Sequence, residues 1–154
     1  MHARYMPRLA VLTLLGAGLL GLTGCGNDSF VSTTQLSGTN EVPAVTTTSA
    51  SGTATATLDG DELSVTGTFR DLSSNLEPVR GSGAHIHSAP AGQNGDIVFN
   101  LEVTSSDQRT GSFTGKAKLT KEQQESFKNG NLYVNIHTVN FMGGEIRGQF
   151  ASVK

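Results

Sequence analysis

The fold of this 154-residue chain can be predicted by starting from one stretch in which apolar and polar residues alternate, Leu132-Tyr133-Val134-Asn135-Ile136-His137. Successive side chains of a β-strand point to opposite faces of the sheet. The three aliphatic side chains of the stretch therefore share one face, which we expect to be the core face. The tyrosine, the asparagine and the histidine share the other face. The pattern is typical of a strand with one apolar side.

Several other stretches alternate in the same way, at residues 53–58, 63–69, 97–103, 113–119 and 145–150. Asp59-Gly60 between the first two is a turn signal and predicts a hairpin. Thr120 and Gln123 match a capping box, which predicts a short helix over residues 121–128. The 19 glycines and the absence of tryptophan accompany many Thr, Ser and Val residues, a composition that favours strands and turns. We predict an all-β fold, a Greek-key β-sandwich or flattened barrel of about eight strands with one short helix.

Three histidines indicate a candidate metal site. In the strand-like run 84–87, His85 and His87 share one face and Ile86 takes the other. His137 also lies opposite the apolar face of its own strand. If the two strands are neighbours, the three imidazoles converge. Neutral imidazole is the commonest metal ligand, and three nitrogen donors suit copper or zinc better than calcium or magnesium. The alternative is that the histidines hydrogen-bond backbone or loop groups and hold the outer face together.

Polar neighbours of these histidines are candidates for orienting them. Asn135, Glu145 and Arg147 are predicted to lie around the metal, where a hydrogen bond to the second ring nitrogen would fix an imidazole. For Glu145 and Arg147, which share the outward face of the last strand, a solvated or cross-strand ion pair is favoured over that role. Tyr133 is interpreted as packing. Glu41-Val42-Pro43 is predicted to be a structural edge, since proline blocks strand pairing.

The N-terminal part of the sequence indicates export and lipid anchoring. Arg4 and Arg8 precede an apolar run over residues 9–22 with the proportions of a signal peptide. Leu22-Thr23-Gly24-Cys25 then resembles a bacterial lipobox, in which the cysteine becomes the lipid-modified first residue of the mature protein. The alternative is an ordinary cleaved signal peptide with an incidental cysteine. We predict a signal peptide at 1–24, a tether at 25–34 and one domain at 35–154.

The cysteine content excludes a structural feature, and the charge argues against one class of partner. Cys25 is the only cysteine, so no intramolecular disulfide can form. The chain has 11 basic and 13 acidic side chains and no basic block, which argues against nucleic acid as a partner. We predict a membrane as partner, through the lipid on Cys25, and an extracytoplasmic place in the cell envelope. The leaflet and any protein or surface partner stay open.

Three segments, in order, resemble the CHRD domain, a module first described in chordin and also found in bacterial proteins. They are residues 36–43 (LSGTNEVP), 84–87 (AHIH) and 133–138 (YVNIHT) followed by 143–148 (GGEIRG). The resemblance covers about residues 35–150, nearly the whole predicted mature chain. The resemblance by itself implies little about function. Together with the lipid anchor, it leads us to predict a binding or structural module on the envelope surface, with copper or zinc as an optional ligand.

A fainter resemblance is to copper–zinc superoxide dismutase, which also has a His-x-His pair on one strand and a histidine on a late strand. His85, His87 and His137 match those positions in order, and Arg147 falls near that family's arginine beside copper. The resemblance implies the alternative function, a copper-dependent redox enzyme with three histidine ligands. The chain departs from that family by lacking a further mature histidine for zinc and the disulfide cysteines.

Overall fold

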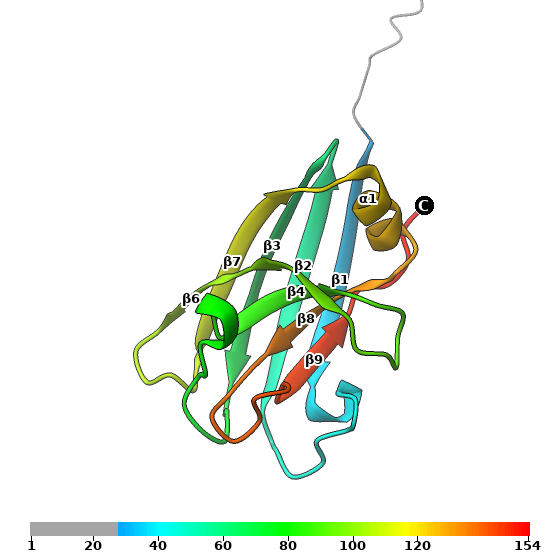
Figure 1. Cartoon of the computed structure of the whole chain (residues 1–154). Coiled ribbons are helices and arrows are strands. Elements are labelled where there is room, and N and C mark those ends of the chain that lie inside the picture. Colours follow the sequence, from blue (N-terminus) through cyan, green and yellow to red (C-terminus); the bar gives the residue numbers. More distant parts are fainter. Residues whose placement is uncertain (1–27) are drawn as a thin grey trace, which may run out of the picture.

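Nine antiparallel strands form one strongly curved sheet with a short helix at one end (Figure 1). The computed structural model describes residues 28–154. Cys25 and the predicted signal peptide lie outside this range. The all-β prediction is confirmed. The strands are β1 (Ser29–Ser37), β2 (Ser51–Asp59), β3 (Glu62–Arg70), β4 (Ala84–Ser88), β5 (Asp96–Asn100), β6 (Glu102–Ser105), β7 (Gly111–Lys118), β8 (Leu132–Ile136) and β9 (Ile146–Gln149).

The strand order explains why the sheet nearly closes into a barrel. It runs β5-β4-β8-β9-β1-β2-β3-β7-β6, so the two edge strands are consecutive in the chain. Only Leu101 separates them, and its N–H donates to the carbonyl of Ala84 at 2.9 Å. The sequence predicted one strand over residues 97–103. The structure divides that run because its first half pairs with β4 and its second half pairs with β7.

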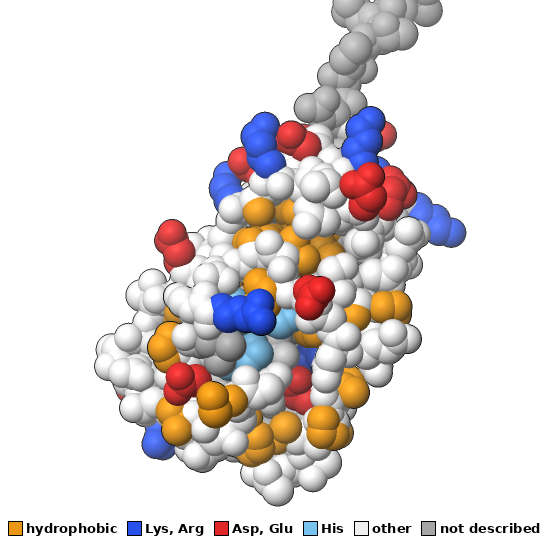
Figure 2. All heavy atoms as spheres, in the orientation of Figure 1, with side chains coloured by type: hydrophobic (Ala, Val, Ile, Leu, Met, Phe, Trp, Pro, Cys, Tyr) orange, Lys and Arg blue, Asp and Glu red, His pale blue; other side chains and the backbone are white. Residues whose placement is uncertain are grey.

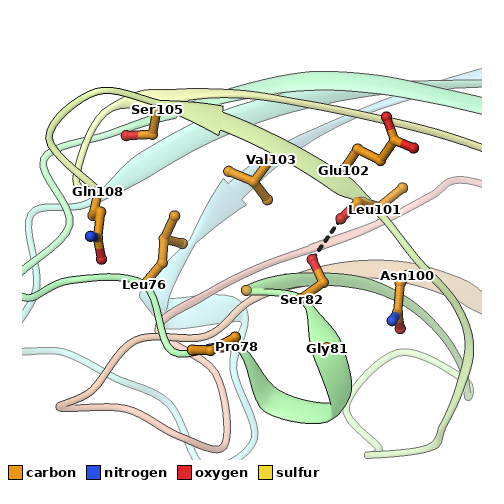
Figure 3. A pocket seen from close by; sticks show the side chains of 11 residues that line it. Leu76, Pro78, Gly81, Ser82, Asn100, Leu101, Glu102, Val103, Ser105 and Gln108 are labelled. Atoms are coloured by element: carbon orange, nitrogen blue, oxygen red, sulfur yellow. Dashed lines mark hydrogen bonds between the residues drawn. The ribbon is translucent and has the colours of Figure 1, made fainter.

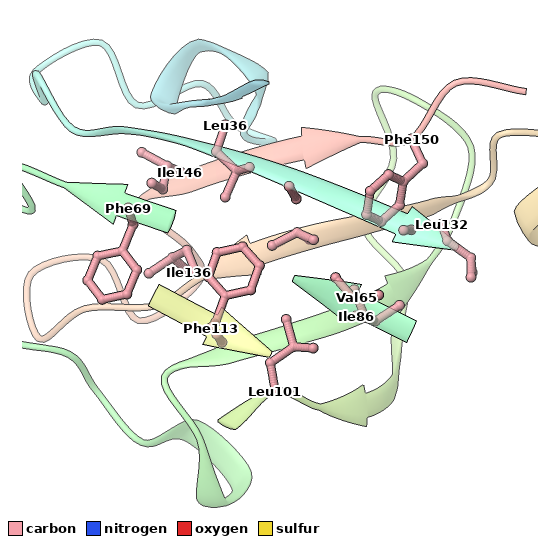
Figure 4. Close-up of a cluster of buried hydrophobic side chains, with 14 of the residues drawn as sticks. Leu36, Val65, Phe69, Ile86, Leu101, Phe113, Leu132, Ile136, Ile146 and Phe150 are labelled. Atoms are coloured by element: carbon pink, nitrogen blue, oxygen red, sulfur yellow. The ribbon is translucent and has the colours of Figure 1, made fainter. Parts of the chain in front are cut away.

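The apolar sides of the strands face inward and form one core (Figure 4). Ile86 of β4 and Ile136 of β8 are fully buried there, as the alternation predicted. The predicted helix forms as α1 (Lys121–Lys128), with both hydrogen bonds of the capping box between Thr120 and Gln123. Its Phe127 is fully buried and contacts Phe150, with ring centroids 6.0 Å apart. The helix therefore covers one end of the barrel.

The predicted tether is wrong for residues 29–34, which belong to strand β1. This strand pairs with β2 along its whole length, from Ser29 opposite Asp59 to Ser37 opposite Ser51. Its inward positions include Ser32, which is only 5% exposed and donates to the carbonyl of Ala151 at 3.1 Å. A polar residue at an inward position hid the alternation, so the sequence resembled a linker.

The place where β5 passes into β6 leaves an open pocket in the barrel wall (Figure 3). The pocket has a volume of about 580 Å³ and lies between β6 and the segment 76–83. Two of its lining residues are joined by a hydrogen bond, in which the Ser82 hydroxyl donates to the Leu101 carbonyl at 2.6 Å. None of the three histidines lines this pocket.

Within residues 28–154, no helix is both long enough and apolar enough to cross a membrane.

Candidate metal centre

The three predicted histidines come together because β4 and β8 are neighbours. The two strands pair antiparallel, with His85 opposite Asn135 and His87 opposite Tyr133. His137 follows β8 directly, and its backbone N–H donates to the carbonyl of Gly83 at 2.8 Å. The convergence expected from the strand faces is therefore present.

The three imidazoles are close enough to serve one ion. One ring nitrogen from each lies within 4.8 Å of the others. Two nitrogens bound to a common ion at ~2.0–2.1 Å are at most about 4.2 Å apart. Where a pair of nitrogens is farther apart than this, the side chains would have to rotate toward one another to share an ion.

The imidazoles face away from the apolar core, as predicted, yet they are buried. His85, His87 and His137 are 0%, 8% and 4% exposed. The segments 89–95 and 139–144 cover this outer face, since carbonyl groups of Gly95 and Met142 contact two of the rings. Figure 2 shows histidine side chains at the floor of a hollow, beside basic and acidic side chains. The three imidazoles therefore lie in a recess below the surface, with little of each ring exposed.

The hydrogen bonds of two histidines fix which nitrogen is available to a metal. Nδ1 of His87 lies 2.9 Å from the carbonyl of Gly95, and Nδ1 of His137 lies 2.9 Å from that of Met142. A carbonyl only accepts, so each neutral ring carries its proton on Nδ1. Both Nε2 atoms are buried and meet no hydrogen-bond partner within the described part of the chain. The Nε2 atoms of His87 and His137 therefore each keep a lone pair for a metal.

Burial keeps these rings neutral. It lowers the pKa of His137 to about 4, against a smaller upward effect of the Met142 carbonyl. The neighbouring His85 and His87 lower it further. Burial also lowers the pKa of His87, and the charge of Arg147 adds to that effect. Neutral imidazole is the form that ligates metals. His87 and His137 are thus in their ligating form at neutral pH.

Two of the predicted orienting residues have other contacts. Asn135 donates from Nδ2 to Glu41 and to the Gly143 carbonyl, at 3.4 and 3.3 Å. Glu145 is fully buried, and its carboxylate accepts from the Thr48 and Thr138 hydroxyls and the Ser73 N–H. Glu145 therefore holds three loops together.

The favoured ion pair between Glu145 and Arg147 is wrong. Both side chains are buried, and the ion pairs among residues 28–154 lie elsewhere, on the surface. The physical reason is that Glu145 is already satisfied by three donors. Arg147 instead places its Cζ 3.5 Å from the centre of the Tyr133 ring. Its Nη1 donates to the carbonyl of Gln93 at 2.9 Å, and its Nη2 donates to Gln149 at 2.7 Å.

A family comparison adds to this geometry. The model of the CHRD domain matches residues 32–150. The chain belongs to the CHRD domain family. Among curated proteins and among solved structures, no match was found.

The segments that carried the CHRD resemblance meet at the histidine recess. The first contributes Glu41, which lies beside Asn135 of the third, and the second contributes His85 and His87. Arg147, also from the third segment, lowers the pKa of His87 through its charge. Segments far apart in the sequence thus line one place on the outer face of the CHRD domain.

Within the site of this CHRD domain, Glu41 occupies a place that the sequence did not predict. Instead of forming a strand edge, it lies in the bend that follows a 3-10 helix (Gly38–Asn40), and it is only 6% exposed. Burial raises its pKa to about 7, opposed by the charge of Arg147 and the hydrogen bond from Asn135. The only signal was its position inside the first family motif.

Proposed function

We propose that this CHRD domain binds one copper or zinc ion through His85, His87 and His137, and that the protein is a metal-binding module of the cell envelope. The observation that carries the proposal is that the buried Nε2 atoms of His87 and His137 have no hydrogen-bond donor among residues 28–154. Burying such groups unpaired costs free energy. A metal ion supplies the missing partner to both.

The donor set favours copper over zinc. All three donors are imidazole nitrogens, which suit both metals. Copper(II) binds nitrogen donors more tightly than zinc by the usual affinity order. We expect both ions to bind and copper to displace zinc.

The envelope location rests on the N-terminal sequence. The lipobox-like stretch ending in Cys25 stands three residues before the first described residue, Asp28. A lipid on Cys25 would hold the barrel close to a membrane by its β1 end. Incorporation of a labelled fatty acid, abolished by Cys25→Ala, tests this part of the proposal.

A second candidate function is copper-dependent redox catalysis of the superoxide dismutase type. Two features favour it: three protein donors would leave a fourth coordination position for a substrate, and histidine side chains lie at the floor of a surface hollow (Figure 2). Catalytic metal sites keep such a position, whereas structural sites close it. Turnover of superoxide by the copper-loaded protein separates an enzyme from a binding module.

Metal titration tests the primary proposal. The full-length protein, purified without chelators, is titrated with Cu²⁺ and Zn²⁺ in a calorimeter. We expect one ion per chain, and His87→Ala or His137→Ala should lower the affinity by at least tenfold. Lys116→Ala, which changes an exposed side chain on β7, serves as the control. If the unmodified protein takes up neither metal, the histidines are structural.

A further inference from the structure

Among the histidines of the metal centre, His87 is held by more contacts than His137. His87 on β4 and Tyr133 on β8 are register partners, and their rings stack with centroids 4.9 Å apart and planes 11° apart. Arg147 on β9 places its guanidinium over the same tyrosine, at 3.5 Å from the ring centre. Because β8 lies between β4 and β9, the imidazole and the guanidinium contact opposite sides of the ring. Tyr133 is thus the middle layer of a three-residue stack.

Two hydrogen bonds to the backbone of Gly95 also connect Tyr133 with His87. The Tyr133 hydroxyl accepts from the backbone N–H of Gly95 at 3.1 Å. The carbonyl of the same Gly95 accepts from Nδ1 of His87 at 2.9 Å. The backbone of Gly95 therefore connects the Tyr133 hydroxyl with Nδ1 of His87, the nitrogen that carries the proton. A side chain at Gly95 is excluded, because its Cβ would clash with the carbonyl oxygen of Ser88.

Arg147 holds the side of the Tyr133 ring that faces away from His87. Its Nη1 donates to the carbonyl of Gln93, two residues before Gly95, and its Nη2 donates to Gln149. The guanidinium thus restrains both the tyrosine ring and the segment that carries Gly95. Arginine suits this place because its planar fork can stack and donate at once.

His137 lacks such support. Its Nδ1 bonds the carbonyl of Met142, whose side chain is 64% exposed. Its ring contacts the other two imidazoles, at centroid distances of 4.9 Å to His85 and 5.8 Å to His87. The orientation of His137 therefore depends on a surface loop.

We propose that Tyr133 is the positioning residue of the metal centre: its ring sets the plane of His87, and its hydroxyl, through Gly95, holds the proton of His87 on Nδ1. Arg147 stabilises Tyr133 in this role. The effect on metal affinity rests on the proposed function. The effect on the tautomer is a property of the metal-free protein and stands by itself.

Two substitutions separate the ring from the hydroxyl. Tyr133→Phe keeps the stack and removes the acceptor for Gly95, whereas Tyr133→Leu removes both. Phe113→Leu is the matched control, since Phe113 is an equally buried ring on the inner face of β7. The first readout is the ¹⁵N NMR spectrum of the His87 imidazole in the full-length, metal-free protein. The second is Cu²⁺ affinity by competition with a chelator.

We expect Tyr133→Leu to mix the two neutral tautomers of His87 and to weaken Cu²⁺ binding by about 10- to 100-fold, the usual effect of losing a group that orients a ligand. Tyr133→Phe should lie between that variant and the unmodified protein. Phe113→Leu should leave the tautomer unchanged even if it lowers stability.

The outcomes separate the two proposals. An unchanged His87 tautomer in folded Tyr133→Leu or Tyr133→Phe overturns the positioning role. A tautomer that responds as expected in a protein that never binds Cu²⁺ supports that role and refutes the metal function alone. Arg147→Lys provides a further check, because it keeps the charge and loses the planar stack; we expect it to loosen Tyr133 and mix the tautomers partially.

Discussion

The two halves of the sheet share one inner face but differ completely on the outside. On β1, β2, β3 and β7 the outer face is open to solvent and carries hydroxyl side chains. One row across these strands consists of four exposed threonines in register: Thr33, Thr55, Thr66 and Thr114. On β4, β8 and β9 the outer face is covered by loops, and its histidines, Tyr133 and Arg147 are buried.

This difference shows what strand alternation does and does not encode. The period of two assigns each side chain to a face, and both halves obey it. It does not determine whether the outer face meets water or a loop. Where loops cover that face, each polar group needs a partner, since an unpaired buried group costs free energy. The covered half therefore carries the candidate site, and the open half is an ordinary solvated surface.

The largest effect expected is that of Glu145 in the covered half. Glu145→Ala should lower the free energy of unfolding by ~3 kcal/mol or more, because three donors on three loops lose their acceptor. Urea denaturation measures it. Asp107→Ala is the comparison, since this exposed carboxylate also accepts three hydrogen bonds, all within one turn. Equal losses for the two variants would contradict the importance of burial.

A smaller effect should appear in the dependence of stability on pH. The folded pKa of Glu41, about 7, lies above the value of 4.5 for the free group. Folding therefore favours the protonated form, and this contribution is full below pH 4.5 and lost as the pH rises through 7. Unfolding in urea at pH 5 and pH 8 should show the unmodified protein losing more stability than Glu41→Gln over this range, by roughly 1–3 kcal/mol.

His137 gives a dependence of opposite sign, which serves as the control for that experiment. Its folded pKa of about 4 lies below the ordinary 6.5. Its contribution is present above pH 6.5 and lost as the pH falls through 4. His137→Ala should therefore reduce the loss of stability below pH 6, and Glu41→Gln should leave that loss in place. If Glu41→Gln and the unmodified protein lose the same stability between pH 5 and pH 8, the pKa of Glu41 is not raised by folding.

Local sequence patterns predicted the strands, the helix and the facing of the histidines. The alternation of Leu132, Val134 and Ile136 placed His137 correctly, and the capping box at Thr120 placed α1. These features depend on residues close together in the chain. The meeting of the imidazoles needed only one further condition, that β4 and β8 be neighbours.

Contacts between distant segments could not be predicted in this way. Nothing in Asn94-Gly95 beyond a turn signal indicates that the Gly95 carbonyl bonds His87. Likewise, no local pattern places Glu41 beside Asn135, 94 positions further on. Such contacts arise from how the loops cover the outer face. For the same reason the sequence did not indicate that backbone carbonyls accept hydrogen bonds from two of the rings.

The smallest effect is expected in the open half. Thr66→Ala removes an exposed hydroxyl between Thr55 and Thr114, and it should change the free energy of unfolding by no more than ~0.5 kcal/mol. Asn135→Ala on β8 is the matched change in the covered half. It should cost ~1–3 kcal/mol, because the carbonyl of Gly143 and the carboxyl of Glu41 lose a buried donor. Urea denaturation of both variants decides the point. If the two losses are alike, the outer faces are energetically equivalent, and the covered face cannot be set apart by the cost of burying its polar groups.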